Sequence, residues 1–381
     1  MPDAYLTATG AVLPGPAVPN ETMEDVLGRI TDEPSRLRAR ILKANGIQTR
    51  HYALDAEGLP THTSAQLAAE AVRAACAARG LAPAALDLLA CATSIPEQLM
   101  PGHGSMVHGE LGSAPCEVAT LHGICSAGIT ALKYATMAVQ TGSARNAVAS
   151  AVERTSMVLR GGAFRAEMQA RSEAEEANPY IGFDQEFLRW MLSDGASAAV
   201  VQDTPRADGI SLRIEWVELV SFSNERPVCM YMGGEPDGRG GLVGWRDGAS
   251  MEDALRTGQL NIHQNVKLLA AYMVETCARA FTAVRDRRGL RAEDVHWFLP
   301  HYSSEFFRDK THDGLVEVGF PIPYERWCSN LTTRGNTGCA SPMIMLHDFL
   351  ASGRLERGQN VLLMVPESGR FSCGWAMLKA V

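Results

Sequence analysis

Three residues of the chain, Cys125, His301 and Asn336, have the types and the surroundings of a nucleophilic site. Each lies at the end of a run that we expect to be buried, in or beside a turn. A cysteine nucleophile forms a thioester, while histidine and asparagine orient groups or stabilise developing charge. Two chemistries use such a set: hydrolysis by a Cys-His-Asn enzyme, and acyl transfer followed by carbon–carbon bond formation. The residue types alone leave both open.

The segment around Cys125 predicts how the nucleophile is presented. Small residues surround it, namely Gly123, Ser126, Ala127 and Gly128, and they allow a sharp turn and close packing. Five residues that follow have helical spacing: Ile129, Leu132, Ala135, Thr136 and Val139. We therefore predict a strand-to-helix turn, with Cys125 at a helix N-terminus whose partial positive charge favours the thiolate. The alternative is a small buried thiol, which is the ordinary state of a cysteine.

Length and composition exclude several classes of protein. The 381 residues are 46% hydrophobic and 20% charged, enough for a large core of two to three domain equivalents. The net charge of −8 argues against binding to nucleic acid or to an anionic membrane surface. No apolar run reaches the length of a membrane span, and the first residues lack the features of a signal peptide.

The nine cysteines are scattered and include no CxxC pair. This usage favours a reducing cytoplasm over a disulfide framework. His122 and Cys125 form an H-x-x-C, but no second ligand pair lies nearby, so no metal site is expected.

The elements that position these residues follow from hydrophobic periodicity. The sequence predicts strands over 3–13, 86–94 and 146–152, a turn into a strand over 191–201, and helices over 20–45, 63–80 and 104–112. The second half repeats this order. A strand ending near His301 corresponds to the one ending near Ser94, and the turn at Asn336 corresponds to the one at Cys125. We predict two similar α/β halves, 1–205 and 206–381, with insertions at about 160–190 and 222–260.

Short motifs along nearly the full length point to one family. They are Asn45-Gly46-Ile47 with Arg50 and His51, Ala92-Thr93-Ser94, Cys125-Ser126-Ala127-Gly128, Asp194-Gly195-Ala196, Pro300-His301, Gly335-Asn336-Thr337 through Ser341, and Ser368 through Gly374. In this order the chain resembles β-ketoacyl-[acyl carrier protein] synthase III and its relatives in the thiolase superfamily.

That resemblance implies a duplicated five-layer αβαβα thiolase fold, a homodimer and a two-step Claisen condensation. Cys125 would accept the acyl group, while His301 and Asn336 would bind the carbonyl of a malonyl- or β-ketoacyl-type extender. The backbone N–H groups of Cys125 and Gly369 would form the oxyanion hole. No cofactor is implied beyond coenzyme A or phosphopantetheine thioesters as substrates, so the expected partners are acyl-CoA or acyl carrier protein.

Departures from the family pattern shape the donor prediction. Tyr302 and Ser303 follow His301, and the region before Asn45 lacks the tryptophan expected there. Basic residues stand in its place, Arg38, Arg40 and Lys43, and they are candidates to contact an acidic carrier or CoA. A solvated helix face explains them equally well.

Other functions compete with the condensing activity that the resemblance implies. A degradative thiolase is disfavoured because Pro366-Glu367-Ser368 holds no second cysteine. An acyltransferase without condensation and a Cys-His-Asn hydrolase are the remaining alternatives. Glu153 is a candidate base or a structural hydrogen-bond partner, and Asp194 is expected to fix a turn.

Overall fold

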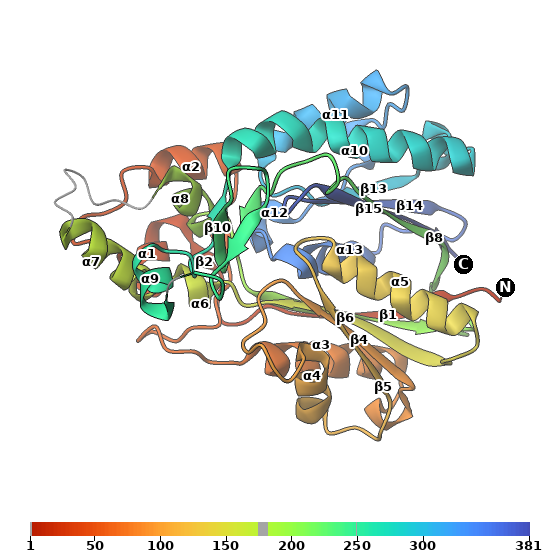
Figure 1. The fold of residues 1–381 in the computed structure, drawn as a ribbon. Helices are drawn as coiled ribbons and strands as arrows, with labels where there is room; N and C mark the ends of the chain where they lie inside the picture. The colour runs from red at the N-terminus through yellow and green to blue at the C-terminus, as the bar shows by residue number, and fades with distance from the viewer. Residues whose placement is uncertain (1, 174–181, 249) are drawn as a thin grey trace.

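The computed structural model describes residues 2–173, 182–248 and 250–381. These residues form five layers (Figure 1). A layer of helices separates the two halves of a twisted sheet, and a further layer of helices covers the outer face of each half. The main sheet is built from β1 (Tyr5–Val12), β4 (Leu88–Thr93), β5 (Glu117–His122), β6 (Asn146–Glu153), β7 (Gly195–Gln202), β8 (Leu212–Ser221), β13 (Trp297–Pro300), β14 (Asn360–Glu367) and β15 (Ser372–Ala380). Their order is β13-β14-β15-β8-β1-β7-β6-β4-β5.

The strand order repeats in the two halves of the chain. In the first half, β7 pairs antiparallel with β1 and β6, and β4 pairs parallel with β6 and β5. In the second half, β15 pairs antiparallel with β8 and β14, and β14 pairs parallel with β13. The halves join where Tyr5 and Leu6 of β1 meet β8. The predicted division between residues 205 and 206 lies in the turn between β7 and β8, and it remains a prediction.

Two helices fill the layer between the half-sheets. These are α5 (Ala127–Gln140) and α13 (Ser341–Ala351), whose buried residues join one core with strands from both halves. Gly128 shows how close this packing is, because a Cβ there would lie 2.2 Å from the carbonyl oxygen of Cys339. Each helix follows a turn that carries a predicted site residue, so the middle layer brings the two turns together.

Each outer layer is formed mainly by two helices. α3 (Ser64–Arg79) and α4 (His103–Leu111) cover the first half, while α10 (Val266–Arg288) and α11 (Arg308–Glu317) cover the second. A capping box explains where α3 begins: Thr63 Oγ1 accepts from the Gln66 backbone N, and Gln66 Oε1 accepts from the Thr63 backbone N. The helix ends at Gly80, whose φ of 68° favours glycine. No helix in the described ranges is long and apolar enough to cross a membrane.

Most predicted elements of the first half are confirmed. The strands expected over 3–13, 86–94 and 146–152 are β1, β4 and β6, and the turn and strand over 191–201 lead into β7. The helices expected over 63–80 and 104–112 are α3 and α4. The helix expected over 20–45 is wrong in its middle: α1 (Met23–Leu27) ends at Gly28, whose φ of 71° departs from helical geometry, and α2 (Arg38–Asn45) begins ten residues later.

The expectation of a buried run before Cys125 is also wrong. β5 lies at the edge of the sheet, and its residues are exposed or half-buried, with none fully buried. The run before Asn336 is a short helix, α12 (Leu331–Arg334), in which only Leu331 is buried, where we expected a buried run. In both cases hydrophobicity indicated burial, but neighbouring strands and helices decide which face is covered.

Both predicted insertions contain regular elements. The first follows α6 (Ser156–Leu159) and holds η3 (Gly161–Phe164), α7 (Arg165–Glu173) and α8 (Phe183–Arg189), and its residues 174–181 lie outside the described residues. The second, expected to be irregular, holds β9 (Met230–Tyr231), the hairpin β10 (Gly234–Pro236) and β11 (Leu242–Gly244), and α9 (Met251–Arg256). The segment β12 (His263–Gln264) then pairs with β9, which closes the second insertion against the body of the protein.

Candidate active site

Cys125 lies in the turn between β5 and α5, two residues before the helix begins. Its side chain is buried, with 8% of the residue exposed. The turn is held by Glu367 at the end of β14, whose Oε2 accepts from the backbone N of Ile124 at 3.1 Å and of Ser126 at 3.2 Å. The hydroxyl of Ser126 donates to the same oxygen. The predicted strand-to-helix turn is confirmed, and an acidic side chain from the other half of the chain stabilises it.

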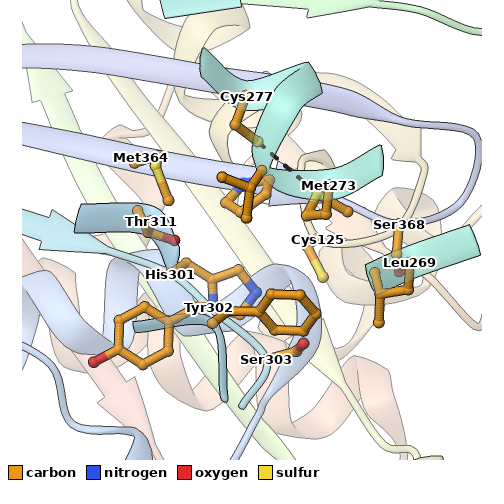
Figure 2. Close-up of a pocket in the computed structure, with 13 residues that line it drawn as sticks. Cys125, Leu269, Met273, Cys277, His301, Tyr302, Ser303, Thr311, Met364 and Ser368 are labelled. Carbon is orange, nitrogen blue, oxygen red and sulfur yellow. Dashed lines mark hydrogen bonds between the residues drawn. The ribbon is translucent and has the colours of Figure 1, made fainter. Parts of the chain in front are cut away.

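His301 follows β13 directly and is 5% exposed. Its backbone N donates to the carbonyl oxygen of Met364 at 2.8 Å, which continues the parallel ladder between β13 and β14 by one step. Because the ladder holds the main chain of His301, its ring leaves the sheet at the carboxyl end of β13. Figure 2 shows this ring and the thiol of Cys125 pointing into the same small pocket.

Asn336 lies between α12 and the single turn η7 (Gly338–Ala340), and it is 2% exposed. Its backbone carbonyl oxygen accepts from the backbone N of Ser193 at 2.9 Å, and its backbone N donates to the carbonyl oxygen of Met191 at 3.2 Å. Its side-chain Oδ1 accepts from the backbone N of Gly338 at 2.9 Å. Since this bond uses the oxygen, the NH₂ end of the amide is the part available to donate to a bound carbonyl.

Two pockets meet at Cys125. The smaller, of about 30 Å³, is lined by His301 and by apolar side chains of α10 such as Leu269 and Met273 (Figure 2). The larger, of about 750 Å³, is lined by Asn336 and by residues of the second insertion. Three residues line both pockets: Cys125, Ser303 and Ser368. The three predicted catalytic residues therefore come together around one buried thiol, with Cys125 shared.

The electrostatics of the thiol differ from the sequence-based expectation. Burial raises the pKa of the Cys125 thiol well above its ordinary value, and the carboxylates of Glu367 and Glu153 raise it further. The expected thiolate at a positive helix end is thus wrong for the unliganded protein. Burial is the largest cause, and the carboxylate of Glu367, which only the tertiary structure brings to the N–H groups of this turn, adds to it.

Burial acts on the histidine in the opposite direction. It lowers the pKa of His301 from 6.5 to about 4, so the ring is neutral at physiological pH. A neutral imidazole keeps one N–H donor, which it can offer to a carbonyl oxygen. The unliganded site therefore holds a neutral thiol beside a neutral imidazole.

Glu153, at the end of β6, is buried beside the nucleophile. Its Oε1 accepts from the backbone N of Ser94 at 3.1 Å and of Cys339 at 3.2 Å, and from the hydroxyl of Ser94. Its Oε2 has no hydrogen-bond partner, and the residue lines the larger pocket. Burial raises the pKa of this carboxyl. Of the two roles predicted for Glu153, the structural one is evident in these bonds.

Asp194 supports the site from behind. Its carboxylate accepts from the backbone N of Ala53 at 2.8 Å and of Ser156 at 2.9 Å, and so ties two segments to the turn before β7. The predicted role of this residue in fixing a turn is confirmed.

The expected second oxyanion donor, Gly369, lies against the nucleophile turn. A Cβ on Gly369 would fall 2.9 Å from the Cδ1 of Ile124, so a side chain there would displace the turn. Its carbonyl oxygen accepts from Cys229 N at 2.9 Å and from Met230 N at 3.2 Å, which anchors it to the second insertion. The roles of Cys125 and Gly369 as backbone donors remain predictions.

The basic residues of α2 lie near the smaller pocket. The helix packs on the turn η5 (Glu305–Phe307), where Ser304 Oγ donates to the carbonyl oxygen of Ala44 at 3.2 Å. Phe307 of that turn lines the pocket. Arg38 forms an ion pair with Glu24 at 2.8 Å, while Arg40 and Lys43 are exposed.

Sequence reasoning missed part of the site. Glu367 was considered only as evidence against a second catalytic cysteine, and the shared walls at Ser303 and Ser368 appeared only as departures from a motif. One signal for Glu367 was available in the sequence, because a charged residue at the end of a strand that is otherwise buried is unusual. Three histidines lie near Cys125 in the sequence: His122 lines the larger pocket, His103 is buried, and His108 Nε2 donates to the carbonyl oxygen of Ala114 at 3.1 Å.

Comparisons with known proteins place this geometry in context. Residues 286–379 match the family model "3-Oxoacyl-[acyl-carrier-protein (ACP)] synthase III C terminal". β-Ketoacyl-[acyl-carrier-protein] synthase III of Sphingopyxis alaskensis is 26% identical over 378 residues, covering 99% of this chain and 98% of that protein. The enzyme of the same name from Clostridium perfringens is 24% identical over 379 residues, covering all of both chains.

Solved structures agree on the fold. The tetronic acid condensing enzyme AbyA1 has a TM-score of 0.74 and 21% identity, covering 99% of both chains. The 3-oxoacyl-(acyl carrier protein) synthase III of Pseudomonas aeruginosa has a TM-score of 0.72 and 22% identity, covering 99% of this chain and 98% of that one. The predicted thiolase fold is confirmed by these likenesses and by the five layers.

Proposed function

Since this chain is related along its whole length to the β-ketoacyl-[acyl-carrier-protein] synthases III, we propose that it is an acyltransferase of the condensing type. It loads an acyl group from a thioester onto Cys125 and joins that group to a malonyl- or β-ketoacyl-type thioester in fatty-acid or related biosynthesis. The observation that carries the proposal is the position of Cys125 in the walls of two pockets, one shared with His301 and one with Asn336.

In the first step, the sulfur of Cys125 attacks the carbonyl carbon of the donor thioester. A new C–S bond forms, the donor C–S bond breaks, and the carrier leaves as a thiol that takes the proton of Cys125. The backbone N–H groups of Cys125 and Gly369 stabilise the oxyanion of this intermediate. Because such donors already point to the place where the negative charge develops, one of them typically raises the rate by about 10²-fold or more.

In the second step, the extender loses its carboxylate as carbon dioxide and leaves an enolate. Neutral His301 and the NH₂ group of Asn336 donate to the enolate oxygen. The enolate carbon attacks the acyl-Cys125 carbonyl, the C–S bond to Cys125 breaks, and the product leaves as a β-ketoacyl thioester. The neutral state of His301 suits this role, because it provides a donor without a charge that would have to be buried.

The electrostatics disfavour the hydrolase alternative. A Cys-His-Asn hydrolase uses the histidine as a base for its cysteine, which leaves a thiolate beside an imidazolium. Burial here opposes both charged forms, since it raises the pKa of Cys125 and lowers that of His301. The site therefore favours a histidine that donates to substrate.

The larger pocket indicates the class of acyl group. Its volume of about 750 Å³ is in the range of pockets that hold drug-sized ligands, about 300–1,000 Å³. Its walls are mostly apolar, and the second insertion contributes Met230, Tyr231 and Trp245. We assign it to a large apolar acyl group, well beyond the size of acetyl.

The smaller pocket indicates the face of this protein at which the carrier binds. Its wall includes Phe307, on the turn that α2 covers, and α2 exposes Arg40 and Lys43 beside it. We assign these two residues to an acidic carrier protein. Arg38, also predicted as a contact, contributes less because it is paired with Glu24.

Two features of the proposal concern the assembly and its location. A homodimer would cover the exposed edge of β5, because an unpaired strand edge favours pairing with another strand. A cytoplasmic location agrees with the nine cysteines, all of which are free. Sedimentation velocity tests the first, and a monomer at micromolar concentration would contradict it.

The central test separates the two half-reactions. His301→Ala and Asn336→Ala should still form the acyl-enzyme, while condensation should fall by about 10²-fold or more, the usual scale for one lost oxyanion donor. Intact-protein mass spectrometry measures the adduct, and product formation from pre-acylated enzyme measures condensation. Cys125→Ala is the control and should form no adduct. Equal loss of both half-reactions in the histidine variant would support the hydrolase assignment instead.

A further inference from the structure

Glu367, the last residue of β14, places a carboxylate directly on the nucleophile turn. It binds the backbone N of the residue before Cys125 and that of the residue after it, Ile124 and Ser126. It also accepts from the Ser126 hydroxyl. The nucleophile is thus held on both sides by one side chain that comes from the opposite half of the chain, 241 to 243 residues away.

The position of this carboxylate opposes the usual activation of a cysteine. The N–H groups at the start of α5, a helix of 14 residues, carry a partial positive charge that would stabilise a thiolate. The Glu367 carboxylate binds N–H groups of this turn and adds a negative charge beside the thiol. Reactive cysteines ordinarily lie in electropositive surroundings, and this one lies between two carboxylates, Glu153 and Glu367.

We propose that Glu367 is a positioning residue for Cys125: it fixes the turn that carries the thiol, and its charge adds to the effect of burial in keeping that thiol protonated in the unliganded enzyme. The proposal rests on the role of Cys125 as the nucleophile. A protonated thiol reacts slowly with alkylating agents and oxidants, so Glu367 protects the resting site. The same carboxylate lies beside Gly369, where a Cβ would be 3.5 Å from its Oε1, and so it also positions the loop of the second backbone donor.

Other charged or titratable groups either line the two pockets that meet at the thiol or act on it electrostatically. They are Glu153 on β6, Cys339 in η7, His301 and Tyr302 after β13, Cys277 on α10, His122 on β5, Glu97 after β4, Tyr231 on β9 and Arg370 after β14. Burial keeps His301 neutral above a pKa of about 4, so it adds no positive charge near pH 7. Arg370 is exposed to solvent, which screens its charge. Burial raises the pKa of the thiol most, and the carboxylates of Glu367 and Glu153 raise it further.

The test is the pH dependence of alkylation of Cys125 by iodoacetamide, with the modified peptide identified by mass spectrometry. In the wild-type protein the midpoint should lie above that of an ordinary thiol, about 8.5. Glu367→Gln keeps the shape of the side chain and removes its charge. Its midpoint should fall by about one pH unit or more, so alkylation near pH 7 becomes about tenfold faster.

Two controls separate charge from packing. Glu356→Gln, an exposed residue before the start of β14, removes a carboxylate at the opposite end of the strand and should leave the profile as in the wild type. Glu367→Asp keeps the charge and should keep the raised midpoint, while its shorter reach slows acyl transfer.

The outcomes are distinct. A Glu367→Gln variant that changes the rate equally at every pH, with no shift of the midpoint, would show a purely structural role and overturn the proposal. A wild-type midpoint at or below that of an ordinary thiol would overturn it even if the variant failed to fold. Failure of the condensing function would appear separately, as the absence of an acyl adduct with any thioester, because iodoacetamide alkylation requires no acyl donor.

Discussion

The neutral state of His301 has a measurable consequence for stability. Burial lowers the pKa of this residue from 6.5 to about 4 in the folded protein. In the unfolded chain the residue titrates near its ordinary value. Between these two values the unfolded state binds more protons, so acid favours unfolding. The contribution of the neutral ring to stability is therefore present above pH 6.5 and is lost as the pH falls towards 4.

The magnitude follows from the two pKa values. For a single group with these values, the loss of folding free energy between pH 7 and pH 5 is about 2 kcal/mol. We predict that the wild-type protein loses about 2 kcal/mol more than His301→Gln over this interval, because glutamine does not titrate. His103, which burial also shifts to a pKa of about 4, is present in both proteins, so its effect cancels in the difference.

The assay is urea denaturation at pH 7 and pH 5, followed by circular dichroism, for the wild type and His301→Gln. As a control, His108→Gln removes a partly exposed histidine of α4 and should keep the wild-type difference. If the wild type and His301→Gln lose the same folding free energy between the two pH values, the pKa of His301 is the same in the folded and the unfolded state. The argument that a buried, neutral imidazole donates to the enolate would then be wrong.

Two other predictions concern substrates. Ile95→Trp places a larger side chain in the wall of the 750 Å³ pocket and should raise the KM for long-chain donors by about tenfold, the effect of about 1.4 kcal/mol. Leu59→Trp, at a residue that is 58% exposed, is the control, and equal effects of both variants would contradict the assignment of the pocket. Arg40→Glu combined with Lys43→Glu should raise the KM for carrier-linked donors, and less so at high salt, because exposed charges act within a Debye length of about 8 Å. Steady-state rates with the same acyl group on CoA provide the comparison, and identical changes for both donors would show that α2 is only a solvated helix face.

The sequence by itself predicted the class of fold, which is confirmed, and named the residues that the structure brings together in the candidate site. Periodicity located the helix α3 within residues 63–80, and alternating elements in both halves indicated the repeated sheet order that the structure shows. Local residue types also placed Cys125 in a strand-to-helix turn, because small residues and helical spacing are properties of a short segment. These features depend on neighbours in the chain, which a sequence displays directly.

The tertiary structure alone decided the electrostatics and the boundaries of the site. Glu367 reaches the N–H groups around Cys125 from more than 240 residues away, so the pattern around the cysteine predicted a thiolate where the fold favours a thiol. The exposure of β5 follows from its place at the sheet edge, which the hydrophobicity of its residues does not reveal. Burial and charge depend on which distant segments pack together, and long-range packing is the property that local residue patterns encode least.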